Sequence, residues 1–132
     1  MKKITIIMLI LTCVSLFCAC SSISENSEND YIQITQSEAA ELMKTENGYI
    51  ILDVRTQEEF RQGHIPNAIC IPNESITNKE IPQLPDKDQL ILVYCRSGNR
   101  SKTASQKLAN IGYTNVREFG GINNWTGEIV KN

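Results

Sequence analysis

The alternation of hydrophobic and polar positions divides most of the chain into segments typical of strands and helices. Segments 49–54 and 90–94 are apolar on both faces, as in parallel strands that helices cover on each side. Shorter apolar runs at 32–34, 68–71 and 115–119 predict three further strands. The pattern therefore predicts an α/β domain with about five parallel strands and helices on both faces of the sheet.

Helix signals separate these strands. Thr35 and Thr56 each stand three residues before a glutamate, which is capping-box spacing, and they predict helices that run to about residues 44 and 62. Segment 101–110 carries apolar residues on one helical face, and Gly112 is the expected residue just past its end. The long connection before the fourth strand contains three prolines, and we expect one helical turn in it near 77–81.

The first 19 residues have the layout of an export signal. A short basic start with Lys2 and Lys3 precedes a mostly apolar run that ends at Ala19, and Cys20 follows. Ala19 and Cys20 resemble the end of a bacterial lipobox, in which the cysteine is lipidated. We therefore expect a signal peptide over residues 1–19 and a membrane lipoprotein on the extracytoplasmic side. An ordinary cleaved signal and an uncleaved anchor stay open, although the run is shorter than the ~20 residues of a spanning helix.

Composition changes again after Cys20. Segment 20–30 is rich in serine, asparagine and glutamate, cannot pack a core, and reads as a solvated tether before a domain over 31–130. Without Lys2 and Lys3 the chain from Cys20 has 11 basic and 15 acidic residues, a net charge of −4. Because it has no basic stripe, we expect no nucleic-acid partner.

The segment 95–100, Cys-Arg-Ser-Gly-Asn-Arg, follows the fourth strand and precedes the third helix. A thiol at that strand end would face N–H groups at a helix N-terminus, a setting that favours an anion such as a thiolate. Arg96, Arg100 and Lys102 add positive charge, which lowers the pKa of a nearby cysteine thiol. We interpret Cys95 as a nucleophile; the alternative is a buried structural cysteine.

Five blocks occur in an order and at spacings that resemble the rhodanese homology domain. They are Asp53-Val54-Arg55, Glu58-Glu59-Phe60, Gly63-His64-Ile65-Pro66-Asn67-Ala68, the 95–100 segment and Gly120-Gly121-Ile122-Asn123-Asn124-Trp125. The resemblance runs from about residue 31 to residue 127. It implies a rhodanese-like fold and sulfur transfer from thiosulfate or a similar small anionic donor.

In that scheme the Cys95 thiolate takes the outer sulfur of the donor, and a thiol or cyanide then removes it from the Cys95 persulfide. The loop that would cradle the persulfide consists of Arg96, Ser97, Gly98, Asn99 and Arg100. Arg96 would also steer the anionic donor. The resemblance implies neither a metal nor an organic cofactor, and we expect a monomer.

Other residues receive supporting or structural interpretations. Asp53 ends a strand and could orient the loop by pairing with Arg100 or with loop N–H groups; the alternative is that it caps its own turn. Arg55 either lines the pocket mouth or is a solvated charge. His64, the only histidine, lies in a turn that resembles the family's structural turn, and a general-base role is the weaker reading. Cys70 reads as a core residue that is not bridged to Cys95.

Rival functions stay open. Cysteine phosphatases and arsenate reductases of this fold resemble the chain, but their loop is one residue longer, with arginine six positions after the cysteine; here that position is Ser101. The domain could also be a non-enzymatic binding module, or a persulfide carrier that serves a partner protein.

We interpret Trp125 as a core plug over the final helix rather than a ligand contact.

The lipoprotein interpretation has a direct test. Metabolic labelling with a palmitate analogue should tag the wild-type protein and miss Cys20→Ala, because the Cys20 sulfur is the atom that would be lipidated. Cys13→Ala is the matched control and should label normally. Equal labelling of wild type and Cys20→Ala would refute lipidation at Cys20.

Overall fold

The computed structural model describes residues 30–132, so the expected signal peptide and nearly all of the expected tether lie outside the described residues. The described chain forms one five-stranded sheet in which all strands are parallel, in the order β1-β5-β4-β2-β3. The strands are β1 (Ile32–Gln33), β2 (Ile50–Asp53), β3 (Ile69–Cys70), β4 (Ile91–Cys95) and β5 (Val116–Gly121). The predicted fold class is confirmed.

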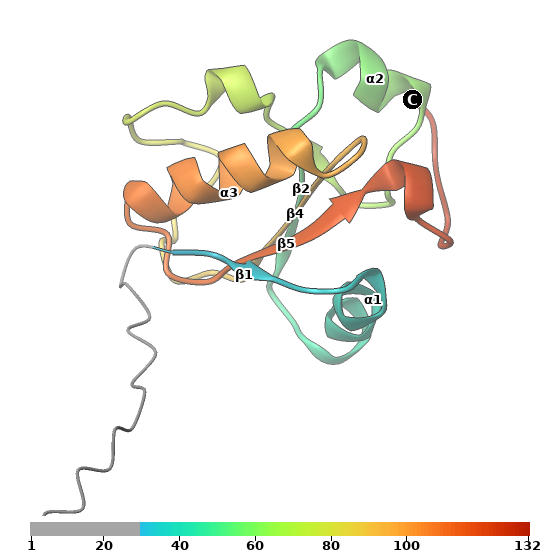
Figure 1. Ribbon diagram of the computed structural model, residues 1–132, viewed down its shortest axis with the longest axis horizontal. Helices are drawn as coiled ribbons and strands as arrows, with labels where there is room; N and C mark the ends of the chain where they lie inside the picture. Colours follow the sequence, from blue (N-terminus) through green and yellow to red (C-terminus); the bar gives the residue numbers. More distant parts are fainter. Residues whose placement is uncertain (1–29) are drawn as a thin grey trace, which may run out of the picture.

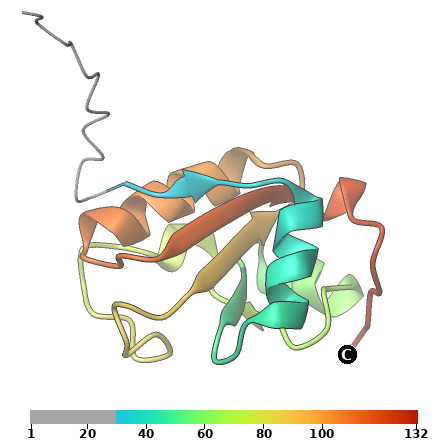
Figure 2. The same cartoon turned by 90° about the horizontal axis from the view of Figure 1, so that it is seen from below.

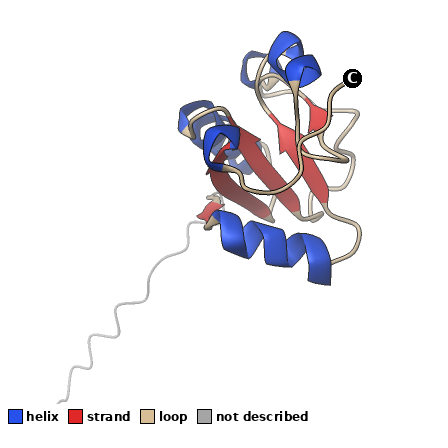
Figure 3. Ribbon diagram, turned by 90° about the vertical axis from the view of Figure 1, so that its right-hand side faces the viewer, coloured by secondary structure: helices blue, strands red, loops and turns tan. Residues whose placement is uncertain are grey.

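Helices cover both faces of the sheet. Figure 1 shows α1 (Gln36–Thr45) below it, and α2 (Gln57–Gln62) and α3 (Asn99–Asn110) above it. Figures 2 and 3 show the same sandwich from below and from the side, with α1 crossing the strands on its own face. Both predicted capping boxes are present: Thr35 and Thr56 each accept a backbone N–H with the side-chain oxygen, and a glutamate three residues on bonds back to each threonine N–H.

Two element boundaries differ from the sequence prediction. The helical turn expected near 77–81 is absent there, and a short 3₁₀ helix (Asn73–Ser75) lies earlier in the connection. Helix α3 begins at Asn99 rather than at Ser101, with Gly98 as its N-cap residue. Asn99 and Arg100 therefore belong to the first turn of the helix, and the loop after Cys95 is shorter than the sequence suggested.

The core has two layers, one on each face of the sheet. The layer under α3 contains Leu52, Val93 and Leu108 among its fully buried members, and Cys95 belongs to it. The layer under α1 contains Ile51, Leu92 and Tyr94. Successive strand residues alternate between the layers because side chains of a strand point to opposite faces. This alternation decides on which side of the sheet each functional side chain lies.

Within residues 30–132, no helix is long and apolar enough to cross a membrane.

Candidate active site

Cys95 is the last residue of β4, at the carboxyl edge of the sheet, and it is only 1% exposed. The chain turns back directly after it, so the Gly98 N–H donates to Cys95 Sγ over 3.0 Å. Helix α3 starts at this point, and the Ser101 N–H in its first turn also bonds to the sulfur. The expected arrangement of strand, tight loop and helix around Cys95 is therefore present.

Two glycines make the turn possible. Gly98 has φ of 105°, in the left-handed region that residues with a side chain rarely adopt. Gly121, at the end of β5, lies so close to the loop that an added Cβ would be 2.1 Å from the Arg96 carbonyl oxygen. The Asn123 N–H donates to that carbonyl over 3.2 Å. The end of β5 thus fixes the loop from one side while α3 fixes it from the other.

The electrostatic setting favours a thiolate. Burial acts to raise the pKa of Cys95, but the hydrogen bond with the Ser101 hydroxyl and those from the N–H groups of Ser101, Gly98 and Ser97 outweigh it, so the pKa of Cys95 lies below its ordinary value. The backbone supplies most of these donors. The lowered pKa of Cys95 therefore follows largely from hydrogen bonds within the turn itself.

Ser101 and Glu118 complete the floor of the site, and the sequence analysis missed both. The Ser101 hydroxyl lies 3.4 Å from Cys95 Sγ and 2.6 Å from Glu118 Oε1, and the Gly120 N–H donates to the same carboxylate oxygen over 2.8 Å. Ser101 is fully buried and Glu118 is 3% exposed. A signal existed in the sequence: Glu118 occupies the same strand face as the core residue Val116.

Arg100 does not reach into the loop. Its two terminal nitrogens each donate over 2.8 Å to Glu59, one to each carboxylate oxygen, in a bidentate pair that joins α3 to α2. The hydrogen bond with Arg100 is the main reason that the pKa of Glu59 falls to about 2. The sequence analysis gave Glu59 as a capping-box residue, which it also is, and as part of a family block, but did not pair it with Arg100. The pairing of Arg100 with Asp53 that we considered is wrong.

Asp53 instead pairs with Arg55 on the other face of the sheet. Arg55 Nη2 lies 2.6 Å from Asp53 Oδ2, and the Arg55 N–H also donates to this carboxylate over 2.9 Å. Arg55 Nη2 further donates to the Gly63 carbonyl over 2.7 Å. Arg55 is 6% exposed, so it is not a solvated charge. The pair ties β2 to the turn after α2, and a supporting role for both residues in the site stays a prediction.

His64 is a structural residue in this fold. Its ring stacks on Phe60 with centroids 3.7 Å apart, its Nδ1 donates to the Phe60 carbonyl over 2.8 Å, and its backbone pairs with Val130. These contacts fix the orientation of the ring and favour a structural role for His64 over the role of a general base.

Cys70 is an unbridged, half-buried thiol. Its Sγ donates to the Arg55 carbonyl over 3.5 Å, and burial together with the charge of Asp53 raises the pKa of Cys70 to about 11. Cys70 therefore stays protonated at neutral pH, whereas the pKa of Cys95 is lowered. The two thiols of the described chain are thus chemically distinct.

Trp125 packs beside Phe119, with ring centroids 5.7 Å apart, in the layer under α1. These contacts support the core-plug reading, but the plug lies on the α1 face of the sheet and not over α3.

Comparison with known proteins decides the family. The family described as "Rhodanese-like domain" matches residues 35–128, which include β2, the Cys95 loop and β5. The chain belongs to the rhodanese-like family.

Relatives of this family differ in size. "Thiosulfate sulfurtransferase PspE" of Escherichia coli is 37% identical over 71 residues, 54% of this chain and 68% of that protein. "Adenylyltransferase and sulfurtransferase UBA4" of Candida albicans is 35% identical over 108 residues, 76% of this chain; the chain spans only about a quarter (25%) of that protein. The solved structure "rhodanese with anions from E. coli" matches with a TM-score of 0.58 at 34% identity and covers 64% of this chain and 99% of its own.

A small cavity of about 180 Å³ lies beside the loop of this rhodanese-like domain. Arg55, Glu59, Arg96 and Asn123 are among its lining residues, and Arg96 is exposed there. Arg55 therefore does line the pocket, which was one of its two sequence-based interpretations. Within residues 30–132 no group of three or more His, Cys, Asp or Glu side chains is placed to hold a metal ion.

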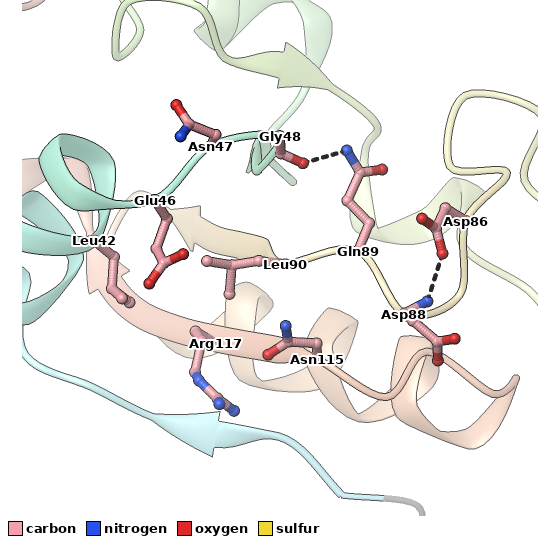
Figure 4. A pocket seen from close by; sticks show the side chains of 10 residues that line it. All are labelled: Leu42, Glu46, Asn47, Gly48, Asp86, Asp88, Gln89, Leu90, Asn115 and Arg117. Atoms are coloured by element: carbon pink, nitrogen blue, oxygen red, sulfur yellow. Dashed lines mark hydrogen bonds between the residues drawn. The ribbon is translucent and has the colours of Figure 1, made fainter.

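A larger cavity, of about 420 Å³, lies elsewhere. Figure 4 shows Glu46, Gln89, Leu90 and Arg117 around it, at the amino ends of the strands. Ligand sites of parallel α/β sheets lie at the carboxyl ends of the strands, where Cys95 is. We therefore assign the chemistry to the smaller cavity, beside the thiol.

The pair of Glu59 and Arg100 predicts a pH-dependent contribution to stability. The pKa of Glu59 in the folded protein, about 2, lies below the ordinary value of 4.5, so the contribution is complete above about pH 5 and disappears as the pH falls toward 2. Because the two side chains are 23% and 31% exposed, we expect Glu59→Gln to cost about 1–2 kcal/mol at neutral pH and much less near pH 3.

Urea denaturation at both pH values measures this difference. Glu58→Gln is the matched control, because its pair with Arg61 is exposed and should contribute little at either pH. An equal loss of stability for Glu59→Gln at neutral and acid pH would contradict a charge-based link between the helices.

Proposed function

We propose that the protein is a sulfurtransferase that carries a sulfane sulfur on Cys95. The observation that carries the proposal is the hydrogen bond from the Gly98 N–H to Cys95 Sγ, 3.0 Å long, in a turn whose Ser97 and Ser101 N–H groups bond to the same sulfur. Such a ring of donors stabilises the thiolate before the reaction and an anionic persulfide after it. The names of relatives such as PspE support thiosulfate as a donor.

The reaction balances in two steps. In the first, the Cys95 thiolate attacks the outer sulfur of thiosulfate; a bond forms between Sγ and that sulfur, the donor's S–S bond breaks, and sulfite leaves with the electron pair. In the second, cyanide or a thiolate attacks the outer sulfur of the persulfide, and Cys95 leaves as a thiolate. The covalent intermediate implies ping-pong kinetics. No step requires a metal or a redox cofactor.

The geometry favours this reaction over phosphate chemistry. A phosphatase of this fold needs its loop arginine to bind two oxygens of the substrate, which is a bidentate contact. In this protein both terminal nitrogens of Arg100 are already bonded to Glu59. Cys95 is also nearly buried, and sulfur transfer leaves a single sulfur atom on it, whereas phosphate chemistry would leave a whole phosphoryl group there.

A persulfide carrier that serves a partner protein is a second candidate. The chain spans only a quarter of UBA4, a protein whose name joins adenylyltransferase to sulfurtransferase, so a rhodanese-like domain can be one part of a larger system. Both candidates use the same Cys95 persulfide. They differ in the acceptor, and activity with small acceptors distinguishes them.

Cys95→Ser should lose all sulfur transfer, because no other atom at the site can carry the intermediate. Intact-mass measurement after thiosulfate treatment should find one added sulfur atom on the wild type and none on Cys95→Ser. Cys70→Ser is the matched control and should still gain the sulfur, since the Cys70 thiol stays protonated at neutral pH, its pKa being raised to about 11. If the added sulfur followed Cys70, the mechanism would be refuted.

Arg96→Ala should weaken the use of anionic donors. Arg96 is exposed beside the cavity, so its contribution is that of a partly solvated ion pair, and we expect KM for thiosulfate to rise about 2–5-fold with little change in kcat. Steady-state kinetics at two salt concentrations measures this, and the salt dependence should shrink in the variant. Lys102→Ala, an exposed cation on α3, is the control and should change KM less.

A further inference from the structure

Glu118 is a buried carboxylate to which the mechanism above assigns no role. It lies on β5, 3% exposed, on the sheet face that α3 covers. Burying a carboxylate is costly unless hydrogen bonds compensate, and here they come from Ser101 and from the Gly120 N–H. The chain therefore places a titratable group one hydroxyl away from its nucleophile.

The backbone of β5 is adapted to hold this carboxylate. Between Val93 and Cys95 the register of β4 against β5 shifts by one residue, so that Val93 pairs with Glu118 but Cys95 pairs with Gly121. Such a bulge redirects the strand. Gly120, with φ of 91°, lies in the bulge and turns its N–H back to Glu118 Oε1 at 2.8 Å.

The Ser101 hydroxyl cannot satisfy all of its neighbours at once. Its oxygen lies 2.6 Å from Glu118 Oε1, 3.0 Å from the Gly98 carbonyl, 3.4 Å from the Gly120 carbonyl and 3.4 Å from Cys95 Sγ. A hydroxyl has one proton to donate and accepts at its lone pairs. The 2.6 Å contact has the length of a charge-assisted bond between a hydroxyl and a carboxylate. With Glu118 ionised, Ser101 therefore donates to Glu118 and accepts from the Cys95 thiol.

From this contact chain we infer that Cys95 and Glu118 share one proton through Ser101. When Cys95 loses its proton to Ser101 Oγ, the proton of Ser101 passes to Glu118 Oε1, and the electron pair stays on the sulfur. Ser101 then donates to the thiolate, and protonated Glu118 donates to Ser101. The pair carries one negative charge in both forms. This inference rests on the proposed function of Cys95 and makes Glu118 a positioning residue that sets the pH at which Cys95 is a nucleophile.

The benefit is electrostatic. A second negative charge beside the thiolate would repel an anionic sulfur donor, and the shared proton removes it at the moment of attack. Sγ and Oε1 are no more than about 6 Å apart through Ser101, close enough for two charges in a buried site to influence each other.

Other ionisable groups around the pair are held elsewhere or lie at its margin. On α3, Arg100 is bonded to Glu59 of α2 and also interacts electrostatically with Glu74 of the 3₁₀ helix. Arg96 points to the cavity beside the loop, and Tyr31, before β1, packs against the same core layer. Asp53 and Arg55 compensate each other under the opposite face of the sheet. Glu118 is therefore the carboxylate bonded into the floor of the site.

The test is the rate of alkylation of Cys95 by iodoacetamide as a function of pH, in the full chain with Cys70→Ser and with mass mapping of the product. Glu118→Gln keeps the shape and the acceptor oxygen but removes the charge, so the midpoint of the rate profile should move down by about one pH unit or more. Glu118→Asp keeps the charge and should stay nearer the wild-type midpoint. Glu41→Gln, an exposed carboxylate on α1, should not move it.

An unchanged or higher midpoint in folded Glu118→Gln would overturn the inference, because it would make Glu118 a purely structural acceptor. If Glu118→Gln does not fold, the side-chain ¹³C signal of Glu118 provides the answer in the wild type. It should change over the pH range in which Cys95 ionises, and that change should vanish in Cys95→Ser; identical profiles in both proteins would refute the shared proton.

Neither measurement uses a sulfur donor. A shifted midpoint in a protein that transfers no sulfur would thus reject the proposed function while leaving the shared proton intact.

Discussion

The hydrogen bond from the Gly98 N–H to Cys95 Sγ is the interaction on which the rest of the site depends. It exists only because the chain reverses within three residues, and that reversal needs the left-handed backbone of Gly98 and the absence of a side chain at Gly121. The sheet supplies the buried position, and the turn into α3 supplies the N–H groups. The pKa of Cys95 is lowered by donors that belong mostly to the backbone, so the chemistry of the thiol is a property of the fold.

Polar contacts that stabilise this turn come from two other parts of the chain. Glu59 on α2 holds Arg100 and with it the first turn of α3, while Asn123, after β5, holds the Arg96 carbonyl. Arg100 thereby has a structural role, which leaves Arg96 as the loop arginine that faces the cavity. A cation fixed by a carboxylate keeps the helix N-terminus in place. The arginine that fixes the start of α3 is therefore not the arginine that lines the cavity.

The sequence predicts those parts of this structure that depend on local signals. The capping boxes at Thr35 and Thr56, the apolar strands and the cysteine at a strand end all follow from residues close together in the chain. Predictions failed where partners are distant. Asp53 was considered as a partner of Arg100, but strand alternation puts its side chain under the other face, where Arg55 meets it. The start of α3 also moved, because the φ of Gly98 places the helix boundary two residues earlier than Ser101 suggested.

Glu118 shows most clearly where prediction from the sequence fails. Because side chains alternate along a strand, the sequence places Glu118 on the same strand face as Val116. Its approach to Ser101, however, depends on the register shift between β4 and β5, which no local pattern encodes. The same shift brings Gly121 against the loop and Gly120 against the carboxylate. One extra residue in β5 therefore forms the close contact that shapes the cradle and the contact that places a charge behind the nucleophile. A buried carboxylate contributes little to stability by itself. Its position behind Ser101 fits the role in the ionisation of Cys95 that we propose better than a role in the packing of the core.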